Sequence, residues 1–244
     1  MLSDTFFIRA LIMSVVFGAA SYLIGSVNFS ILLSRAIGGQ DIRKSGSGNA
    51  GATNMLRTYG KKMGVITLLL DVLKGIVCVL AAVLFVNYYH SAAAASVWES
   101  ADLAMYQSAL SLVSIPYIAG VCVILGHNFP LYFGFKGGKG VATSLGVVLM
   151  LDWKAGLIIA VCAIAVMAVT RYVSLGSILG GAAYIIAEII KMCVTGSFNV
   201  TELVCVIIIG GLLIIRHHAN IKRLLSGTEN KLGAKKTTDN HTEE

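Results

Sequence analysis

The chain has 244 residues, of which 57% are hydrophobic and only 13% are charged, and it carries a net charge of +7. Its mean hydropathy is +0.82. This composition excludes an ordinary soluble domain and indicates a membrane protein. Excess positive charge in a membrane protein is typical of cytoplasmic loops that face anionic lipid, so we expect membrane lipid as a partner and no nucleic acid.

Seven apolar runs approach the length of about 20 residues that a membrane-spanning helix needs. We therefore predict an all-α, polytopic bundle of about seven transmembrane helices, with five or six crossings as the alternatives. The fourth run is short for a span, so it should be tilted, broken or packed inside the bundle. The runs are residues 5–33, 63–88, 109–126, 140–153, 155–170, 173–192 and 200–216.

The basic residues indicate the orientation of the chain. With seven crossings and the N-terminus outside, the inner segments hold fifteen of the 19 lysines and arginines, in agreement with the positive-inside rule. The C-terminus and three glycine-rich segments, residues 45–62, 126–143 and 216–231, then face the cytoplasm. We expect a single membrane-embedded domain over 1–231 and a polar, disordered tail over 232–244.

Neither disulfide bonds nor a metal site is expected. The five cysteines fall inside apolar runs without a C-x-x-C spacing, which predicts small buried hydrophobic residues. The adjacent His217 and His218 point about 100° apart on a helix and lack a converging carboxylate or cysteine, so they do not form a metal site. The sequence therefore predicts no metal and no cofactor.

The first segment is rich in glycines, hydroxyls and amides. Backbone N–H groups between glycines can approach an anion closely, as in a phosphate nest, and Arg57 can clamp two phosphate oxygens. The G-x-G-x-x-G spacing is that of a dinucleotide fingerprint, but the strand that this motif requires does not precede it. An ordinary flexible loop is the alternative. The expected substrate-binding residues here are Gly46, Gly48, Asn49, Gly51, Thr53 and Asn54.

The second segment contains KGGKG, which is similar to a Walker A loop but lacks its spacing and its Ser or Thr, so we do not expect an ATPase. A glycine-rich turn ahead of the fourth run still offers free N–H groups and a helix dipole to an anion. The alternatives are that the lysines are positive-inside markers and that His127 is an interfacial anchor. The expected substrate-binding residues here are Lys136, Gly137 and Gly138.

The third segment is expected to continue the last helix. His217 and Asn220 would then be i, i+3 neighbours, and Arg216, Asn220 and Arg223 would share a second stripe. A histidine beside an amide and two arginines suits proton handling or contact with phosphate. We expect Arg216 and Arg223 to bind substrate.

Two pairs of charged residues lie inside apolar runs at i, i+3 spacing. An unpaired charge at the centre of a bilayer costs about 2.5–3.5 kcal/mol on insertion scales, so Asp71 and Lys74 are expected to pair and to face the protein interior. A structural role for this pair is favoured over a catalytic one, although spacing leaves both open. Glu188 and Lys191 lie nearer the outer end, where the lysine can snorkel to the surface.

Together the three segments resemble the signature motifs of a known family. SGSGNAGATN, GHNFPLYFGFKGGKGVAT and HHANIKRLLSGTENK look like the motifs of the bacterial acyl-phosphate:glycerol-3-phosphate acyltransferases, in the same order along nearly the whole chain. The resemblance implies an inner-membrane enzyme with a cytoplasmic active site. Such an enzyme transfers a fatty acyl group from acyl phosphate to the sn-1 hydroxyl of glycerol 3-phosphate, and it releases lysophosphatidic acid and phosphate in the first step of phospholipid biosynthesis.

The resemblance also implies which residues act. Ser47, Arg57, Lys139, His217 and Asn220 fall on the positions that are regarded as essential in the family. Ser47 and its glycines would hold acyl phosphate, Lys139 and Arg57 would neutralise phosphate charge, and the other two would orient the hydroxyl or a phosphate. The proton would go to His217 or to a substrate phosphate.

Two other functions are weaker interpretations. A transporter for phosphorylated metabolites would use similar cationic loops, but its path should carry charges at mid-depth or on both faces. A metal-dependent phosphotransferase would need clustered aspartates, and the aspartates before the tail are dispersed.

Overall fold

The computed structural model describes residues 2–95 and 114–233, and within these ranges all regular structure is helical. This confirms the predicted all-α class. Two short helices and two 3-10 turns join the longer ones: α2 (Phe29–Gly38), α10 (His218–Leu225), η1 (Ile42–Lys44) and η2 (Leu131–Phe133). The longer helices are α1 (Leu2–Ser26), α3 (Ala52–Ala95), α5 (Ile115–Asn128), α6 (Val141–Leu151), α7 (Trp153–Thr170), α8 (Val173–Thr195) and α9 (Val200–Arg216).

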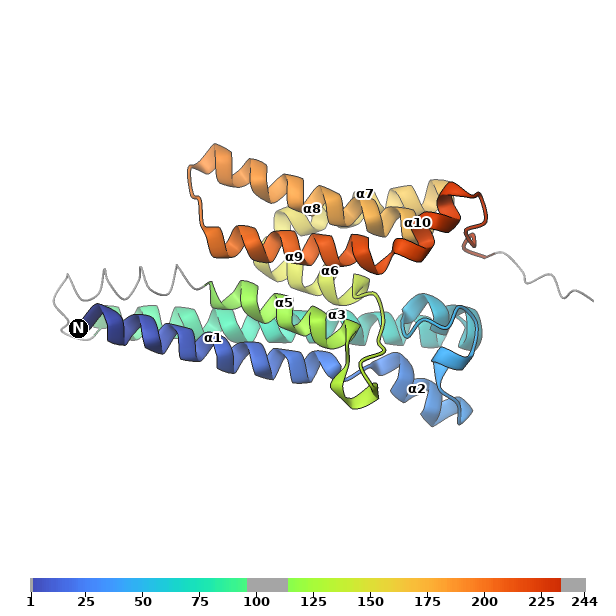
Figure 1. Cartoon of the computed structure of the whole chain (residues 1–244), viewed down its shortest axis with the longest axis horizontal. Helices are drawn as coiled ribbons and strands as arrows, with labels where there is room; N and C mark the ends of the chain where they lie inside the picture. Colours follow the sequence, from blue (N-terminus) through green and yellow to red (C-terminus); the bar gives the residue numbers. More distant parts are fainter. Residues whose placement is uncertain (1, 96–113, 234–244) are drawn as a thin grey trace, which may run out of the picture.

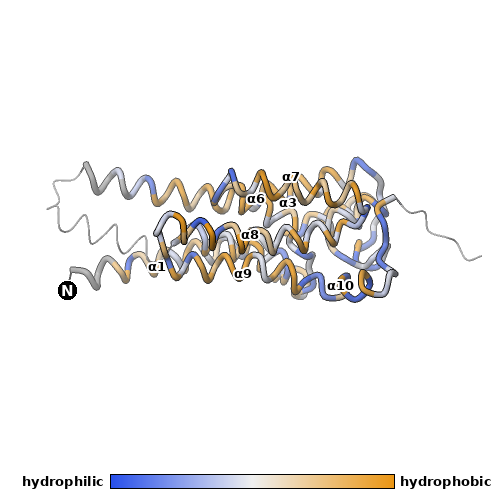
Figure 2. Tube along the Cα trace, turned by 90° about the horizontal axis from the view of Figure 1, so that it is seen from above, coloured by the Kyte–Doolittle hydropathy of each residue, from blue (hydrophilic) through white to orange (hydrophobic). Residues whose placement is uncertain are grey.

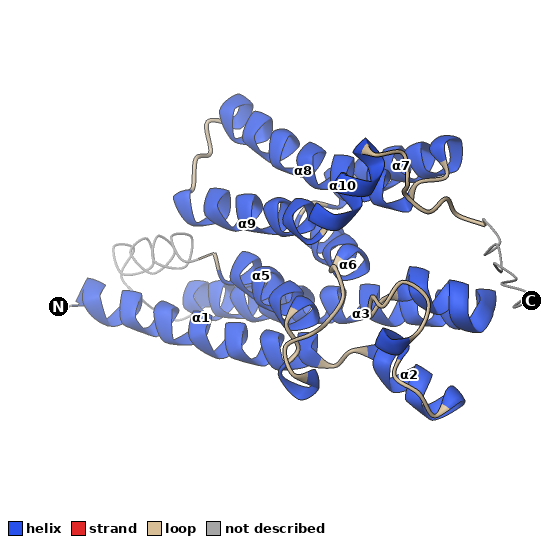
Figure 3. Cartoon of the chain, turned by 45° about the vertical axis from the view of Figure 1, so that its right-hand side comes forward, coloured by secondary structure: helices blue, strands red, loops and turns tan. Residues whose placement is uncertain are grey.

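The helices form two groups that run along the same axis, with α6 between them (Figure 1). One group contains α1, α3 and α5, and the other contains α7, α8 and α9. Figure 3 shows the same division from another direction. α1 packs on α5 and α3 packs on α6, whereas the groups meet where α5 contacts α9 and α6 contacts α7.

Several helices are long and apolar enough to cross a bilayer. Five of them meet this criterion in the described ranges, and α9 with α10 makes a sixth candidate that is bent by 53°. As expected for the fourth run, α6 is short, with 11 residues, and it packs inside the bundle between α3 and α7. At 1.5 Å per residue, α6 covers about 16 Å of the roughly 30 Å hydrocarbon core.

Small residues let the central helices approach closely. A Cβ atom on Gly75 would overlap the carbonyl oxygen of Thr143, and one on Gly146 would overlap that of Val72. The backbones of α3 and α6 therefore touch, as is typical of membrane helices whose association depends on packing rather than on the hydrophobic effect. This contact fixes α6, and with it the loop that precedes α6.

Three boundaries differ from the predictions. α1 ends at Ser26, and Asn28 begins a separate helix, because its side chain caps α2 by accepting a hydrogen bond from the N–H of Ile31. α3 begins at Ala52, so much of the first segment is helical rather than a loop, with a break at Gly60. α3 also continues to Ala95, past the start of the expected outer loop. The rest of that loop, and most of the expected tail, lie outside the described residues.

The cysteine prediction is only half right. Cys78 and Cys205 are buried, but Cys162 and Cys193 are exposed on the surfaces of α7 and α8. An apolar membrane helix does not need to bury its small hydrophobic residues in protein, because lipid accommodates them equally well.

Polar residues gather at one end of the bundle. Figure 2 shows most of the hydrophilic segments at the end where α10 lies, while the long helices are mainly hydrophobic along their length. The N-terminal part of α3, the loop before α6 and α10 all reach this end (Figure 1). The three glycine-rich segments are therefore brought together.

Candidate active site

The first segment begins with a tight turn that the Asn54 side chain stabilises by hydrogen bonds to the backbone. Gly46 has a φ of +59°, which a side chain would strain, and a Cβ there would also overlap the Asn54 side chain. The Oδ1 of Asn54 accepts from the N–H of Ser47 at 2.9 Å, and its Nδ2 donates to the carbonyls of Ile42, Ser45 and Asn49. Asn54 is thus a positioning residue. Contrary to the prediction, its amide is not available to bind a substrate. Ser47 is exposed at the turn.

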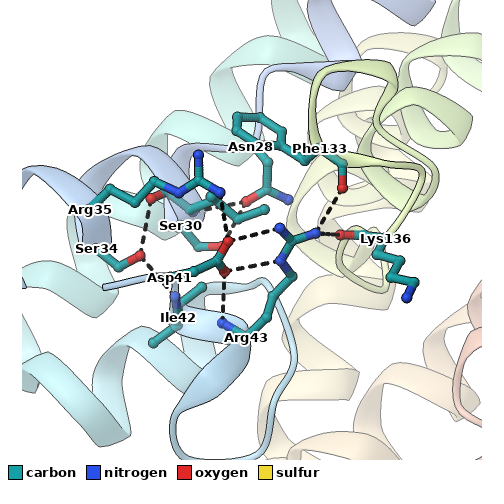
Figure 4. A network of polar contacts seen from close by, with 10 residues as sticks. Asn28, Ser30, Ser34, Arg35, Asp41, Ile42, Arg43, Phe133 and Lys136 are labelled. Carbon is teal, nitrogen blue, oxygen red and sulfur yellow. Dashed lines mark hydrogen bonds and ion pairs between the residues drawn. The ribbon is translucent and has the colours of Figure 1, made fainter. Parts of the chain in front are cut away.

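Arg43 ties the first segment to the second (Figure 4). Its Nη1 donates to the carbonyls of Phe133 and Lys136, both at 2.8 Å, while Asp41 accepts from its Nε and Nη2. The hydrogen bond from Arg43 is the main cause that holds the pKa of Asp41 well below its usual range, although burial opposes it. The Lys136 ammonium points away from this network, so its carbonyl is what the network uses. No motif in the sequence predicts this role of Arg43, which lies just before the glycine-rich motif.

The second segment leads directly into α6, as predicted. Gly140 is the N-cap of α6, with a φ of +82°, and the free N–H groups of the first turn lie beside Lys139. The Lys139 ammonium donates to Oδ1 of Asn220, which belongs to α10. The Gly138 carbonyl accepts from Nη2 of Arg216 at 2.9 Å, and the Arg216 guanidinium lies over the Phe129 ring. Two contacts between the second and third segments therefore close the site.

The third segment does not continue α9. The helix ends at Arg216, and α10 begins at His218 after a bend, so His217 lies at the break. His217 is 3% exposed, and its Nδ1 lies 2.7 Å from the carbonyl oxygen of Leu213. Because a carbonyl can only accept, Nδ1 carries the hydrogen in the neutral ring, and Nε2 presents a lone pair.

Glu229 is a second residue that the sequence analysis missed. Its carboxylate accepts hydrogen bonds from Nδ2 of Asn220 at 2.6 Å, from Oγ of Ser174 at 2.8 Å and from Nε of Arg223 at 2.7 Å. Burial opposes ionisation, but these hydrogen bonds and the Arg223 charge lower the pKa of Glu229. Glu229 thereby fixes the Asn220 amide with its oxygen toward Lys139. A lone carboxylate within a basic segment is the signal that could have revealed it.

Burial also changes Lys139. Removal of its ammonium from water, together with the nearby charges of Arg223, Arg216 and Arg57, lowers its pKa to about 8, against the opposing effect of Glu229. At neutral pH the Lys139 side chain is therefore still mainly charged and can donate hydrogen bonds, but it loses its proton more easily than an exposed lysine does.

Arg57 and Ser47 differ in what they contact. Arg57 is exposed, and its Nη2 lies 3.5 Å from the carbonyl oxygen of Asn230, so it reaches the third segment. Among the described residues no hydrogen bond or ion pair joins Ser47 to Lys139 or His217, and Ser47 bonds within its own turn. The structure thus places Ser47 at the same end as the Lys139–Asn220 pair without direct contact between them.

The intramembrane pair forms as predicted. Lys74 Nζ lies 2.9 Å from Oδ1 of Asp71, and both side chains are buried. His127 joins them and is 3% exposed, so it is not an interfacial anchor. Lys191 pairs with both Glu188 and Asp152 near the opposite end. Within the described ranges, no group of three or more His, Cys, Asp or Glu side chains could hold a metal ion.

Comparisons with known proteins agree with this arrangement. A sequence model of the family described as glycerol-3-phosphate acyltransferase matches residues 15–227. A glycerol-3-phosphate acyltransferase of Mesorhizobium japonicum is 44% identical over 225 residues, which cover 92% of this chain and 97% of the relative. One from Clostridioides difficile is 39% identical over 223 residues, which cover 91% and 97%.

Two solved structures are also similar. The crystal structure of PlsY (YgiH), an integral membrane glycerol 3-phosphate acyltransferase, in its glycerol 3-phosphate form has 35% identity and a TM-score of 0.72. It covers 90% of this chain, and this chain covers 96% of it. The lysophosphatidic acid form gives 34% identity and a TM-score of 0.68, with coverages of 90% and 95%. The chain belongs to the integral-membrane glycerol-3-phosphate acyltransferase family, which decides against the transporter.

Proposed function

We propose that the chain transfers a fatty acyl group from acyl phosphate to the sn-1 hydroxyl of glycerol 3-phosphate, and that it releases lysophosphatidic acid and phosphate as the first step of phospholipid biosynthesis. The observation that supports this most directly is the convergence of three cationic, glycine-rich segments at one end of an apolar bundle. Two anionic substrates repel each other, and such an end of the protein can hold both while apolar helices contact the acyl chain.

Each segment has a role in this proposal. Ser47 and the N–H group of Gly46 hold the acyl phosphate, and Arg57 clamps its phosphate, whereas the N–H of Gly48 already donates to the carbonyl of Ser45 and shapes the turn. Lys139, with the first turn of α6, neutralises phosphate charge. Asn220 orients a hydroxyl or phosphate through an amide that Glu229 already fixes. The remaining substrate-binding residues, by this proposal, are Asn49, Gly51, Thr53, Lys136, Gly137, Gly138, Arg216 and Arg223, of which Gly138, Arg216 and Arg223 also hold the site together.

The reaction requires no covalent enzyme intermediate. The glycerol hydroxyl oxygen attacks the acyl carbonyl carbon, the carbon–oxygen bond to phosphate breaks, and phosphate leaves with the electron pair. The hydroxyl proton passes to Nε2 of His217 or to a phosphate oxygen. Positioning of the two reactants supplies several kcal/mol, and donors aimed at the developing oxyanion supply roughly 3–4 kcal/mol more.

The activity can be tested directly. Purified protein that is given palmitoyl phosphate and glycerol 3-phosphate should release phosphate without added metal, and acyl-CoA should not replace the acyl phosphate. Activity that depends on acyl-CoA would overturn the donor assignment.

The site can be tested by substitution. Ser47→Ala, Lys139→Ala and His217→Ala should abolish turnover while the protein stays folded. Lys154→Ala, an exposed lysine at the start of α7 and far from the site, is the matched control and should keep full activity. Full activity in all three site variants would refute the assignment, and a His217→Ala variant that loses only a few-fold in kcat would assign the proton to phosphate.

The orientation belongs to the same proposal. The chain crosses the plasma membrane seven times with α6 as a short crossing, residues 1–231 form one domain, and the N-terminus lies outside. The distribution of basic residues supports a cytoplasmic site. Single cysteines placed at Ser47 and at Thr228, in a variant without the five native cysteines, should react with an impermeant maleimide only after the cells are opened. Labelling of either position in intact cells would contradict the proposed orientation.

A further inference from the structure

Three buried side chains, one of which belongs to the second segment, are not part of the proposed chemistry. They are Asp71, Lys74 and His127, whose exposed fractions are 1%, 4% and 3%. Lys74 Nζ lies 2.9 Å from Oδ1 of Asp71 and 2.8 Å from Nδ1 of His127. His127 Nδ1 is also 3.5 Å from the same Asp71 oxygen. We call these residues the Asp71–Lys74–His127 cluster.

The cluster holds the break between α1 and α2. Lys74 Nζ donates to the carbonyl oxygens of Gly25 at 3.2 Å and Val27 at 3.1 Å, which lie at the C-terminal end of α1. Such carbonyls have no partner within their own helix, and inside a membrane protein they must find one. Lys74 thus satisfies the end of α1 where the chain turns into α2 and the first segment.

The same cluster reaches the second segment through His127. The His127 carbonyl accepts from the N–H of Gly138 at 3.1 Å, and the neighbouring Asn128 carbonyl accepts from Gly137. The ring lies directly against Gly138, because a Cβ on Gly138 would overlap Nε2 of His127. That Cβ would also come within 2.5 Å of the Ala50 carbonyl oxygen, in the first segment.

Gly138, in the second segment, is therefore held between the His127 ring and the backbone of the first segment. The His127 ring contacts it on one side, the Ala50 backbone lies beside it, and its carbonyl accepts from Arg216. The next residue is Lys139, whose ammonium bonds Asn220. A rotation of the His127 ring would move the Gly138 peptide and hence Lys139.

An apolar core would hold these helices together as well as buried charges do. Burial of an ion pair costs several kcal/mol per ion in desolvation, which good geometry only offsets, so its advantage over apolar packing is a fixed arrangement rather than stability. Because Lys74 Nζ lies 2.8 Å from Nδ1 of His127, this contact orients that edge of the ring toward Lys74.

We propose that the Asp71–Lys74–His127 cluster is a positioning unit for the reaction: it sets the His127 ring, and through Gly138 it places Lys139 against the first segment. These residues do not touch the substrates. The inference rests on the proposed role of Lys139 in phosphate binding. By this proposal, the Asp71–Lys74 pair is structural, and it affects the rate by positioning Lys139.

The sharpest test is His127→Asn. The Asn amide oxygen replaces Nδ1 as an acceptor for Lys74, but the outer edge of the ring that contacts Gly138 is lost. We expect a melting midpoint within a few degrees of the wild type and a kcat/KM for glycerol 3-phosphate and palmitoyl phosphate that is at least tenfold lower. Wild-type kcat/KM in the folded variant would overturn the proposal.

A matched pair of lysine variants separates positioning from general stability. Lys74→Met and Lys191→Met each remove a lysine that pairs at i, i+3 with a buried acid, but only Lys74 contacts the second segment, through His127. Per folded protein, Lys74→Met should lose at least tenfold in kcat/KM and Lys191→Met less than twofold. Equal losses in the two variants would overturn the proposal. If Lys74→Met does not fold, His127→Asn decides alone.

A combination with Lys139 distinguishes this inference from the proposed function. If the cluster acts through Lys139, the losses from His127→Asn and Lys139→Arg should combine to less than their product, whereas an independent role gives the full product. Full activity of Lys139→Ala would refute the proposed role of Lys139. An inactive Lys139→Ala together with a fully active His127→Asn would refute only the positioning unit.

Discussion

Replacement of Glu229 should both destabilise the protein and reduce its activity. In Glu229→Ala, Asn220, Ser174 and Arg223 lose the carboxylate that accepts from all three. A hydrogen bond to a charged group contributes about 1.5–3 kcal/mol. The three contributions do not add, because they share one acceptor and because Arg223 is 40% exposed and is screened by solvent. We therefore expect a loss of about 2–3 kcal/mol.

The activity should fall by more than the stability change explains. Without Glu229, the Asn220 amide is held by Lys139 alone, so its position is no longer fixed from both sides. Misplacement of a catalytic group by about 1 Å can cost 10²-fold, so we expect kcat/KM to fall by roughly that factor. Glu229→Gln keeps one acceptor and should lie between the wild type and the alanine variant.

The assay measures phosphate release and thermal unfolding in the same detergent. A loss of 2–3 kcal/mol corresponds to a decrease of about 4–12 °C in the melting midpoint for a chain of this size. Glu202→Gln, at the opposite end of α9, is the control and should retain full activity. A Glu229→Ala variant with the melting midpoint and kcat/KM of the wild type would refute the reasoning.

Three further changes have defined outcomes. The charged form of Lys139 binds phosphate, and its pKa is lowered to about 8, so kcat/KM should fall as the pH rises through 8. Lys139→Arg should shift that fall to higher pH, because arginine stays charged. A pH profile of kcat/KM that is unchanged in Lys139→Arg would contradict this. Arg43→Ala removes the hydrogen bonds to the carbonyls of Phe133 and Lys136 in the loop before α6, so it should raise KM at least fivefold with a smaller change in kcat. Initial-rate kinetics measure this, and an unaltered KM would contradict the role of Arg43 in holding the loop. Gly146→Leu forces α6 from α3 and should cost more than about 3 kcal/mol, so a normal melting midpoint would contradict the close contact.

The sequence predicted that distant residues would come together, but it did not predict the contacts that hold them. Lys139 and Asn220 lie 81 residues apart, and the resemblance of their motifs placed them in one site, where they bond each other. Asn54 has the residue type of a phosphate ligand, yet its amide is consumed by the turn below Ser47. Arg43 has no periodicity or motif of its own, and Glu229 is marked in the sequence only as a lone carboxylate in a basic segment, so their contacts were needed to assign their roles. The break at His217 was also missed, because an apolar run followed by polar residues looks like one continuous helix.

Composition and the spacing of apolar runs determined by themselves that this chain is an all-helical membrane protein, because each run must satisfy its own backbone hydrogen bonds in lipid. The count of crossings predicted that the glycine-rich segments share one side, and the basic residues predicted that this side is cytoplasmic. Only the tertiary structure decided that Lys74 completes the end of α1, that His127 lies against Gly138 and that Glu229 turns Asn220 toward Lys139. These contacts join residues far apart in the sequence, and no local propensity encodes them; they exist because packed helices bring particular donors within reach of particular acceptors.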